Sequence, residues 1–487
     1  MGKKKRNLII GIAAVVVLAV ILFFVFFRGK NNQYCASIPK DAVGLVRIDA
    51  SSVFERYDAE LSGLIGKKNG IDALSDQFGI DLKSPIYGFA TPKGASGVVA
   101  KMKSTEELKT MGRLLGAKAT EKQGYNWIQK GDFVICFNKS KLLAMQGGGM
   151  NIRKDMIALM EQDEEESIIS TQMFENLGTM KEPIVLFTSL KSLPKDALSG
   201  MALAGSVKPE DMDLDIAVTL DIVKDKLIMA FQTYANSDAM KKYYDEYASK
   251  MKKIDGSYIS SVQNAPIVWG SMSIPGKLIA DGVSKNLAEL MSQMPKGNAE
   301  SQMLVQGVAA VVKTISCMEG DVNFTLTDAQ SGNFMVQAKV KDNSVMDLIG
   351  FAEGLVEGES DVKFKKVNDN SFTVTSEGKT IWGGVNGEDF FFANNLDLLK
   401  TVGQEVETGL ESLKNDICNN YFYVTVDVQQ ILLPLLMNDP SMRQMGSLLK
   451  ERLSQLDRLT LSSSDLHRIE LALSVKDGQD FVKALLK

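Results

Sequence analysis

The chain opens with a run of twenty residues, Leu8–Phe27, that is apolar throughout and contains no charge and no proline. At a rise of about 1.5 Å per residue, a helix of this length matches a hydrocarbon core of roughly 30 Å. Four basic residues precede the run at 3–6, whereas only Arg28 and Lys30 follow it closely. The positive-inside bias therefore predicts a single-pass anchor with its N-terminus in the cytoplasm and one long segment beyond the membrane.

A cleaved signal peptide and a lipoprotein signal are two other interpretations of this segment. A signal peptide has an apolar core of about 7–15 residues with a small-residue cleavage site close behind it, and here the core is longer. Acylation would fall on Cys35, but Gln33 and Tyr34 stand directly before it, where small residues are needed. The sequence therefore favours a retained anchor and an ordinary thiol at Cys35 in a linker.

The segment beyond the anchor is long and acidic. From Asn31 onward it has 457 residues, enough for two or more domains. It carries 49 basic and 60 acidic residues, a net charge of −11. Nucleic-acid binding needs clustered basic residues, so we expect no nucleic-acid partner. The same charge disfavours docking on an anionic lipid surface beyond the anchor itself.

The four cysteines lie far apart and show no CxxC spacing; they are Cys35, Cys136, Cys317 and Cys418. A metal cluster or a disulfide scaffold is therefore not expected. One or two long-range disulfides in an oxidising compartment remain open, with a pairing that the sequence does not define.

One segment type occurs four times: a strand, a turn, a second strand, a short polar cap and an amphipathic helix. Strand positions alternate with period two, and helix positions follow i, i+3, i+4, i+7. In the first copy, Ser104 and Glu107 form a capping-box pattern. Each copy follows another strand that leads into a helix, so the module is β-α-β-β-α. The copies begin at Ile86–Ala90, Ile216–Leu220, Val322–Leu326 and Leu459–Ser463.

Copies one and three are each followed by a similar hairpin, which begins at Trp127 in one and at Trp382 in the other. We interpret both tryptophans as core residues rather than ligand-stacking ones. The chain is therefore predicted to hold two repeated halves. We expect a cytoplasmic tail at 1–7, the anchor at 8–27, a linker at 28–37, a first half at 38–250, a connection at 251–263 and a second half at 264–487.

The predicted fold class is α+β. An N-terminal transmembrane helix precedes the two repeated halves. Because each strand set has an apolar face that its helices can cover, each half should be mostly antiparallel sheet with helices packed on one face.

Motifs for catalysis are scarce. The single histidine, His467, shares a predicted strand face with apolar residues, and no GxSxG elbow accompanies it. Two Ser-x-x-Lys matches, Ser37 with Lys40 and Ser192 with Lys195, have a proline directly before the lysine and are interpreted as helix entries. Phosphate-loop, dinucleotide, zinc-protease and EF-hand motifs do not occur in the sequence. We therefore predict no catalytic, cofactor-binding or metal-ligating residue, and no cofactor.

Three features together resemble a family of bacterial envelope proteins known only as a domain of unknown function. They are the opening IPKDAVGLVRID at Ile38–Asp49, the paired tryptophan hairpins and the fourfold strand–cap–helix unit. Members of that family are often lipoproteins of Gram-negative bacteria, and this chain departs from them by its retained anchor and by lacking a lipoprotein cysteine. The resemblance implies architecture and a location in the cell envelope. The predicted anchor adds the expectation of a single pass through the inner (cytoplasmic) membrane, with the bulk of the chain in the periplasm.

A large duplicated acidic segment without a catalytic constellation favours non-enzymatic binding or scaffolding of envelope components. An alternative is a carrier or chaperone for an apolar ligand such as a lipid, for which 24 methionines would suit an adaptable lining. A further alternative is an envelope hydrolase that assembles carboxylates or serine from distant positions. The expected partners are the membrane, through 8–27, and an envelope protein or lipid.

Overall fold

The computed structural model describes residues 33–65, 70–114, 116–147, 149–190, 213–263, 265–281, 283–284, 299–329, 331–356, 362–402, 404, 406–432, 434 and 451–486. The predicted tail at 1–7, the predicted anchor at 8–27 and residues 28–32 of the predicted linker lie outside these residues. Among the helices that are described, none combines the length and apolar composition that crossing a bilayer requires.

The described residues form two compact units. Unit 1 holds those up to 190 together with 213–236 and 479–486, and unit 2 holds those from 237 to 478. Both units are built from antiparallel strands and helices, so the predicted α+β class with an antiparallel sheet is confirmed.

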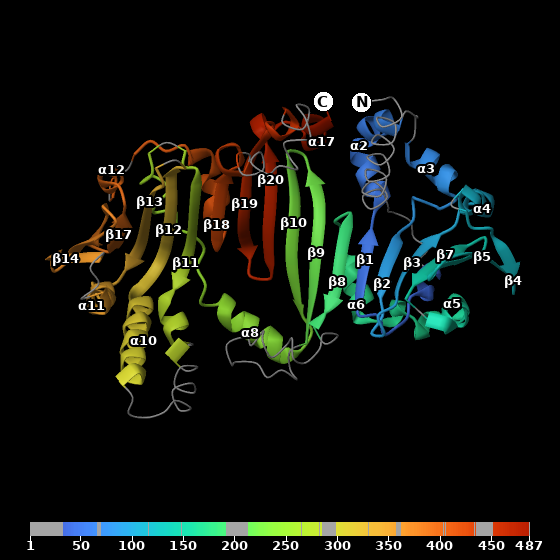
Figure 1. Cartoon of the computed structure of the whole chain (residues 1–487), viewed down its shortest axis with the longest axis horizontal. Coiled ribbons are helices and arrows are strands. Elements are labelled where there is room, and N and C mark those ends of the chain that lie inside the picture. Colours follow the sequence, from blue (N-terminus) through green and yellow to red (C-terminus); the bar gives the residue numbers. More distant parts are fainter. Residues whose placement is uncertain are drawn as a thin grey trace. The chain divides into compact units, whose positions relative to one another are not determined.

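The described part of unit 1 contributes ten strands to an antiparallel sheet. They are β1 (Gly44–Ile48), β2 (Ile86–Ala90), β3 (Ser96–Lys101), β4 (Thr120–Lys122), β5 (Tyr125–Lys130), β6 (Phe133–Phe137), β7 (Lys141–Gln146), β8 (Ile184–Ser189), β9 (Leu214–Val223) and β10 (Lys226–Ala235). Their order is β10-β9-β8-β1-β2-β3-β7-β6-β5-β4 (Figure 1). The helices are η1 (Gln33–Ser37), α2 (Ala50–Ile65), α3 (Gly70–Phe78), α4 (Thr105–Leu114), η2 (Gly149–Asn151), α5 (Ile152–Glu161), η3 (Glu164–Glu166), η4 (Ile168–Ser170), α6 (Gln172–Thr179) and α17 (Phe481–Leu486).

The described part of unit 2 also contributes ten strands. They are β11 (Val268–Pro275), β12 (Met318–Asp328), β13 (Asn333–Val340), β14 (Val362–Asn368), β15 (Ser371–Ser376), β16 (Lys379–Asn386), β17 (Asp389–Ala393), β18 (Phe422–Asp427), β19 (Leu456–Asp465) and β20 (Arg468–Val475). The helices are α8 (Asp238–Ala248), α10 (Ala299–Cys317), α11 (Val345–Val356), α12 (Leu396–Leu399), η7 (Glu411–Leu413), α13 (Lys414–Cys418), η8 (Val428–Leu432) and η9 (Lys476–Gly478).

The strands of unit 2 follow the order β20-β19-β18-β11-β12-β13-β17-β16-β15-β14. Each strand number in this order is ten higher than the number at the same place in unit 1. The strands of the two units therefore have the same order. The four predicted strand–turn–strand–helix copies are present as β2–β3–α4, β9–β10–α8, β12–β13–α11 and β19–β20–α17.

The helices that end copies two and four do not belong to the same unit as the strands that precede them. Helix α17 follows β20 of unit 2, but it is part of unit 1, where it contacts α2 and the Phe481 N–H donates to the Lys224 oxygen at 2.6 Å. Helix α8 follows β10 of unit 1 and is part of unit 2. The predicted halves at 38–250 and 264–487 describe the sequence repeat and remain a prediction. The compact units differ from them in that each contains the helix that follows the other unit's last strand.

Apolar cores lie on both faces of each sheet, which corrects the prediction that helices pack on one face. Val99 and Ala100 are neighbours on β3 and so point to opposite faces. Val99 shares a core with Met156 of α5, whereas Ala100 shares a second core with Leu108 of α4. Unit 2 likewise has a core on each face. The reason is that strands such as β3 carry apolar residues at consecutive positions. We call the Val99 side and its unit 2 counterpart the inner face, and the Ala100 side the outer face.

The folded part of unit 1 begins before the predicted first half. Cys35 lies in η1 and is fully buried, and Tyr34 beside it is 4% exposed. The Tyr34 hydroxyl donates to the backbone oxygen of Pro85. The last five residues of the predicted linker therefore belong to unit 1, and Tyr34 and Cys35 are part of its inner core. Acylation of Cys35 would require its thiol to leave that core.

Candidate functional site

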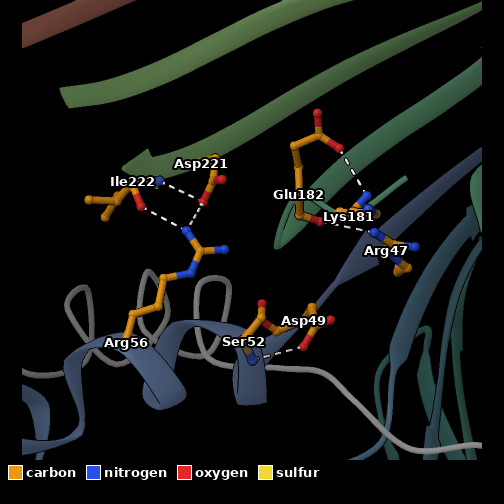
Figure 2. Close-up of polar contacts among 8 residues, drawn as sticks. All are labelled: Arg47, Asp49, Ser52, Arg56, Lys181, Glu182, Asp221 and Ile222. Carbon is orange, nitrogen blue, oxygen red and sulfur yellow. Dashed lines mark hydrogen bonds and ion pairs between the residues drawn. The ribbon is translucent and has the colours of Figure 1, made fainter. Parts of the chain in front are cut away.

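The end of β1 and the start of α2 gather several charged side chains (Figure 2). Asp49 caps α2, because its Oδ1 accepts the backbone N–H of Ser52 at 3.0 Å. Burial raises the pKa of Asp49 to about 6, against the opposing effects of that N–H and of nearby Arg47. In α2, the Arg56 guanidinium pairs with Asp221 of β9 at 2.7 Å. These contacts hold α2 on the sheet.

Arg47 of β1 ties helix α6 to the sheet. Its guanidinium donates to the backbone oxygens of Leu177, Met180 and Glu182 at 2.8, 2.9 and 2.9 Å. All three oxygens lie in or just beyond the last turn of α6, where helix carbonyls lack partners within the helix. The role of Arg47 is therefore to complete this helix end, and it is 8% exposed.

Unit 2 contains a close pair of carboxyl groups. The Asp321 carboxyl accepts the backbone N–H groups of Asp255 and Gly256, both at 3.0 Å. Burial, and then the hydrogen bond with Asp255, raise the pKa of Asp321 to about 7. Burial also acts to raise the pKa of Asp255, but hydrogen bonds from Asp321 and Ser257 outweigh it and lower that pKa. Because Asp321 is 1% exposed, the pair is engaged in holding the chain rather than facing a substrate.

Next to this pair, three side chains of unit 2 form a closed polar network. The Tyr258 hydroxyl donates to Asp389 Oδ1 at 2.8 Å, and Lys339 Nζ lies 2.8 Å from the same oxygen. Lys339 Nζ also lies 5.7 Å from the centre of the Tyr258 ring. Burial and the hydrogen bond to Asp389 raise the pKa of Tyr258. Each charge in this network has an opposite partner.

A row of apolar residues, with one glycine in each unit, crosses the outer face of each sheet. In unit 1 the row is Phe231, Val218, Leu186, Val46, Gly88 and Val98, each opposite the next across neighbouring strands. In unit 2 the matching row is Leu471, Leu461, Val424, Gly270, Phe324 and Val336. Five of these side chains are between 38 and 45% exposed: Val98, Leu186, Phe231, Phe324 and Leu461. We call these two sets the outer rows.

Described residues of unit 1 line cavities of 580, 430 and 240 Å³. The first lies at the C-terminal end of α4, where Arg113 and Lys118 line it. The second lies against α3 and α4, with Phe78 and Met111 in its wall. The third lies beside η1 and is lined by Gln33, Tyr34, Lys101, Ser140 and Lys141. No group of three or more potential metal ligands occurs in the described part of the chain.

The structure separates the residues of the Ser37–Lys40 match. The Ser37 hydroxyl contacts Met160 Sδ at 3.8 Å, whereas Lys40 Nζ donates to the backbone oxygen of Glu165 at 3.0 Å. These two side chains therefore have different partners and do not form a nucleophile–base pair. Ser192 and Lys195 lie outside the described residues.

His467 and the four cysteines offer no catalytic arrangement among the described residues. His467 lies in the turn between β19 and β20, and its ring contacts that of Tyr244 at a tilt of 45°, with centroids 4.3 Å apart. All four cysteines are free thiols, and Cys35, Cys136 and Cys317 are buried.

The two tryptophan hairpins are not equivalent in the fold, contrary to the match seen in the sequence. Trp127 lies on β5, the fifth strand of unit 1, and is 2% exposed. Trp382 lies on β16, whose counterpart in unit 1 is β6. The sequence match slipped by one strand because the similar turns Gly131-Asp132 and Gly387-Glu388 connect β5 to β6 in unit 1 but β16 to β17 in unit 2.

Comparison with known proteins supports the resemblance noted from the sequence. A model of the domain of unknown function DUF4836 matches residues 73–480. None of the curated proteins matches this chain. Crystal form I of TP0453 is similar at 10% identity and a TM-score of 0.27, over 46% of this chain and 87% of that one. Crystal form IV of TP0453 is similar at 11% identity and a TM-score of 0.27, over 41% and 80%. These values are too low to support an argument about fold or function. Because the family model spans most of its length, the chain belongs to the DUF4836 family.

Proposed function

We propose that this protein is a membrane-anchored envelope protein that binds another envelope protein, without catalysis, through the outer rows of its two sheets. The observation that carries the proposal is that the outer row of each unit contains exposed apolar side chains: Val98, Leu186 and Phe231 in unit 1, and Phe324 and Leu461 in unit 2.

A single exposed apolar residue is ordinary, but a contiguous row is not. Neighbouring strands lie about 4.8 Å apart, so a row across six strands is roughly 24 Å wide. That width suits a protein interface of standard size, about 800 Å² on each partner. An anionic lipid surface is disfavoured as the occupant by the net charge of −11 beyond the anchor. A protein with an apolar surface is therefore the occupant to which we commit.

The location rests on the predicted anchor. A helix over 8–27, preceded by four basic residues, would keep the N-terminus in the cytoplasm and place both units in the periplasm. Such a tether would hold the outer rows near the membrane, where envelope proteins are concentrated.

A lipid carrier would use the same outer rows in a different way. A carrier normally encloses most of the surface of its ligand. The cavities of 580 and 240 Å³ have lysine or arginine in their walls, and the cavity of 430 Å³ has Glu106 and Glu107 beside its apolar residues. Charged walls of this kind do not suit an acyl chain. Open rows favour a partner that contacts the sheet from outside.

Native mass spectrometry of the full-length chain, gently extracted from its own membrane, tests the proposal. The variants Leu186→Glu and Phe324→Glu each place a charge in one outer row. Val367→Glu is the control, because Val367 is 56% exposed and lies on β14, away from both rows.

We expect the wild type and the control to carry the same protein partner in a fixed ratio, and each row variant to lose it. A wild type without a protein partner, or row variants that retain it, would overturn the proposal. An added mass of lipid size that both row variants lose would replace the protein with an apolar ligand.

A further inference from the structure

The matching registers of the two sheets allow their side chains to be compared position by position. Strands β3 and β7 of unit 1 place Lys101 directly opposite Lys141. Their counterparts β13 and β17 place Lys339 directly opposite Asp389. The Met102 N–H donates to the Ser140 oxygen next to the first pair, as the Val340 N–H donates to the Glu388 oxygen next to the second. The two pairs are therefore equivalent.

A tyrosine accompanies each of these pairs. Tyr34 precedes Leu45 by eleven residues, and Tyr258 precedes Trp269 by the same number. Leu45 and Trp269 hold matching positions in β1 and β11. In unit 2, the Tyr258 hydroxyl donates to Asp389, as described above. In unit 1, Lys141 stands where that carboxylate would be.

Unit 1 therefore has two cations where unit 2 has an ion pair. Like charges directly opposite each other on a sheet are destabilising. Lys101 is relieved by Asp81, whose Oδ2 lies 2.9 Å from its Nζ. Lys141 has no carboxylate partner among the described residues, although it is only half-exposed, and burial lowers its pKa. Asp81 offsets the charge of Lys101, so the positive charge of Lys141 remains uncompensated.

A cavity adjoins this uncompensated charge. It has a volume of about 240 Å³ and is lined by Gln33, Tyr34, Lys101, Ser140 and Lys141. At about 30 Å³ for each water in the liquid, the space holds roughly eight waters, which is sufficient for a phosphate group with a short substituent. Lysine is a common phosphate ligand in proteins.

We propose that this cavity binds a phosphate group, whose oxygens take the place that the Asp389 carboxylate has in unit 2. One uncompensated positive charge matches one negative charge, so a phosphodiester is favoured over a doubly charged phosphate. The expected contacts are ion pairs from Lys141 and Lys101. No bond is made or broken in this binding step.

Two sources could supply this chemistry. Gln33 lies six residues after Phe27, the end of the predicted anchor, so an extended connection spans about 20 Å. A lipid headgroup phosphodiester would thus be within reach of the cavity. A free phosphate compound of the periplasm is the other source. The overall acidity of the chain opposes general adsorption to anionic lipid, and a defined cavity avoids that cost by admitting one headgroup.

Calorimetric titration of the full-length chain in a neutral detergent tests the proposal. The probes are inorganic phosphate and a short-chain phosphatidylglycerol below its micelle concentration. Lys141→Asp would recreate the ion pair of unit 2, and Lys141→Gln removes the charge alone. Lys139→Asp is the matched control. It makes the same charge change two residues away, at an exposed residue that is not among those lining the cavity.

We expect the wild type and the Lys139→Asp variant to bind at least one probe with affinities within twofold of each other. Both Lys141 variants should bind at least tenfold more weakly, and Lys141→Asp should unfold at a temperature no lower than the wild type. Binding of the lipid alone would identify a headgroup site, whereas equal binding of both probes would identify a site for free phosphate. The proposal is overturned if the wild type binds neither probe, or if the Lys141 variants bind as the wild type does. Because the outer rows are untouched by these variants, this result is independent of the protein-binding proposal.

Discussion

At the residue scale, buried charged groups serve the fold more than they serve a reaction. Asp321 of β12 accepts backbone N–H groups of Asp255 and Gly256, which fixes the segment that leads into Tyr258. Burial raises the pKa of Asp321 from its ordinary value of 3.8 to about 7. The folded chain therefore holds a proton there that the unfolded chain releases at much lower pH.

The pH dependence of stability follows from this raised pKa. Between pH 4 and 7 the native state binds more protons at Asp321 than the unfolded state, so the free energy of unfolding falls as pH rises through this window. The slope from this group is at most about 1.4 kcal/mol per pH unit. The lowered pKa of Asp255 acts in the opposite sense, in the more acidic range where that group titrates.

Replacing Asp321 with Asn should flatten the stability curve between pH 4 and 7. The Asp321→Asn variant keeps an acceptor for the two backbone N–H groups and carries no titrating proton, so we expect its stability to vary less with pH than that of the wild type. Urea unfolding followed by tryptophan fluorescence at several pH values would measure this. An unchanged slope in the variant would show that Asp321 does not titrate in this range.

At the element scale, single side chains decide which helices are held to the sheet. Arg47 joins β1 to the end of α6 through three backbone oxygens. Arg56 joins α2 to β9 through a partly exposed ion pair with Asp221 and a hydrogen bond to the Ile222 backbone oxygen. The two arginines have the same charge and differ in burial, with Arg47 at 8% exposure and the Arg56 side chain at 37%. Burial should therefore determine how much each arginine contributes to the free energy of unfolding.

Replacing Arg47 with Met should destabilise unit 1 by about 3 kcal/mol, because three carbonyl oxygens lose the guanidinium donor and two of these hydrogen bonds are buried. Arg56→Met is the matched control and should cost less than about 1 kcal/mol, since exposed ion pairs contribute little. Chemical denaturation of both variants would measure the difference. An equal loss of stability in the two variants would contradict the conclusion that Arg47 holds the end of α6 to the sheet.

The start of helix α4 illustrates what local sequence can predict. Ser104 and Glu107 were expected to form a capping box, and the Ser104 hydroxyl does contact the Glu107 carboxylate. The Ser104 N–H, however, donates to the Gly79 oxygen rather than to Glu107. The cap residues could be read from the chain because they are three positions apart, whereas the Gly79 contact depends on how α3 packs beside α4.

At the scale of the whole molecule, the two sheets share a strand order but differ in their interiors. On the inner face of unit 1, Tyr87 lies opposite Val99, and both are buried in an apolar core. The counterpart in unit 2 is Asn323 opposite Gln337, both 1% exposed. The Gln337 amide nitrogen has no hydrogen-bond partner among the described residues. Such a polar interior costs stability, so we expect unit 2 to be the less stable of the two.

The exchange of terminal helices gives a further prediction. Phe481 of α17 is 5% exposed and belongs to unit 1, although it follows the last strand of unit 2. Phe481→Ala should cost about 3 kcal/mol by opening a cavity. Hydrogen exchange should show lost protection in α2 and at the β9–β10 turn of unit 1. Loss of protection confined to β19 and β20 would instead assign α17 to unit 2.

The sequence by itself determined the local elements of this protein: the four strand–turn–strand–helix copies and the antiparallel α+β class. These follow from periodicity and capping, which act over a few residues. It also predicted an anchor at 8–27, which stays a prediction. Tertiary structure alone decided which strands are neighbours, and with it the burial of η1, the cores on both faces and the one-strand slip between Trp127 and Trp382. It also decided that Lys141 stands opposite Lys101, forty positions away, where the repeat has Asp389. The physical reason is that register brings distant positions together, and no local pattern encodes which distant strand will supply the partner.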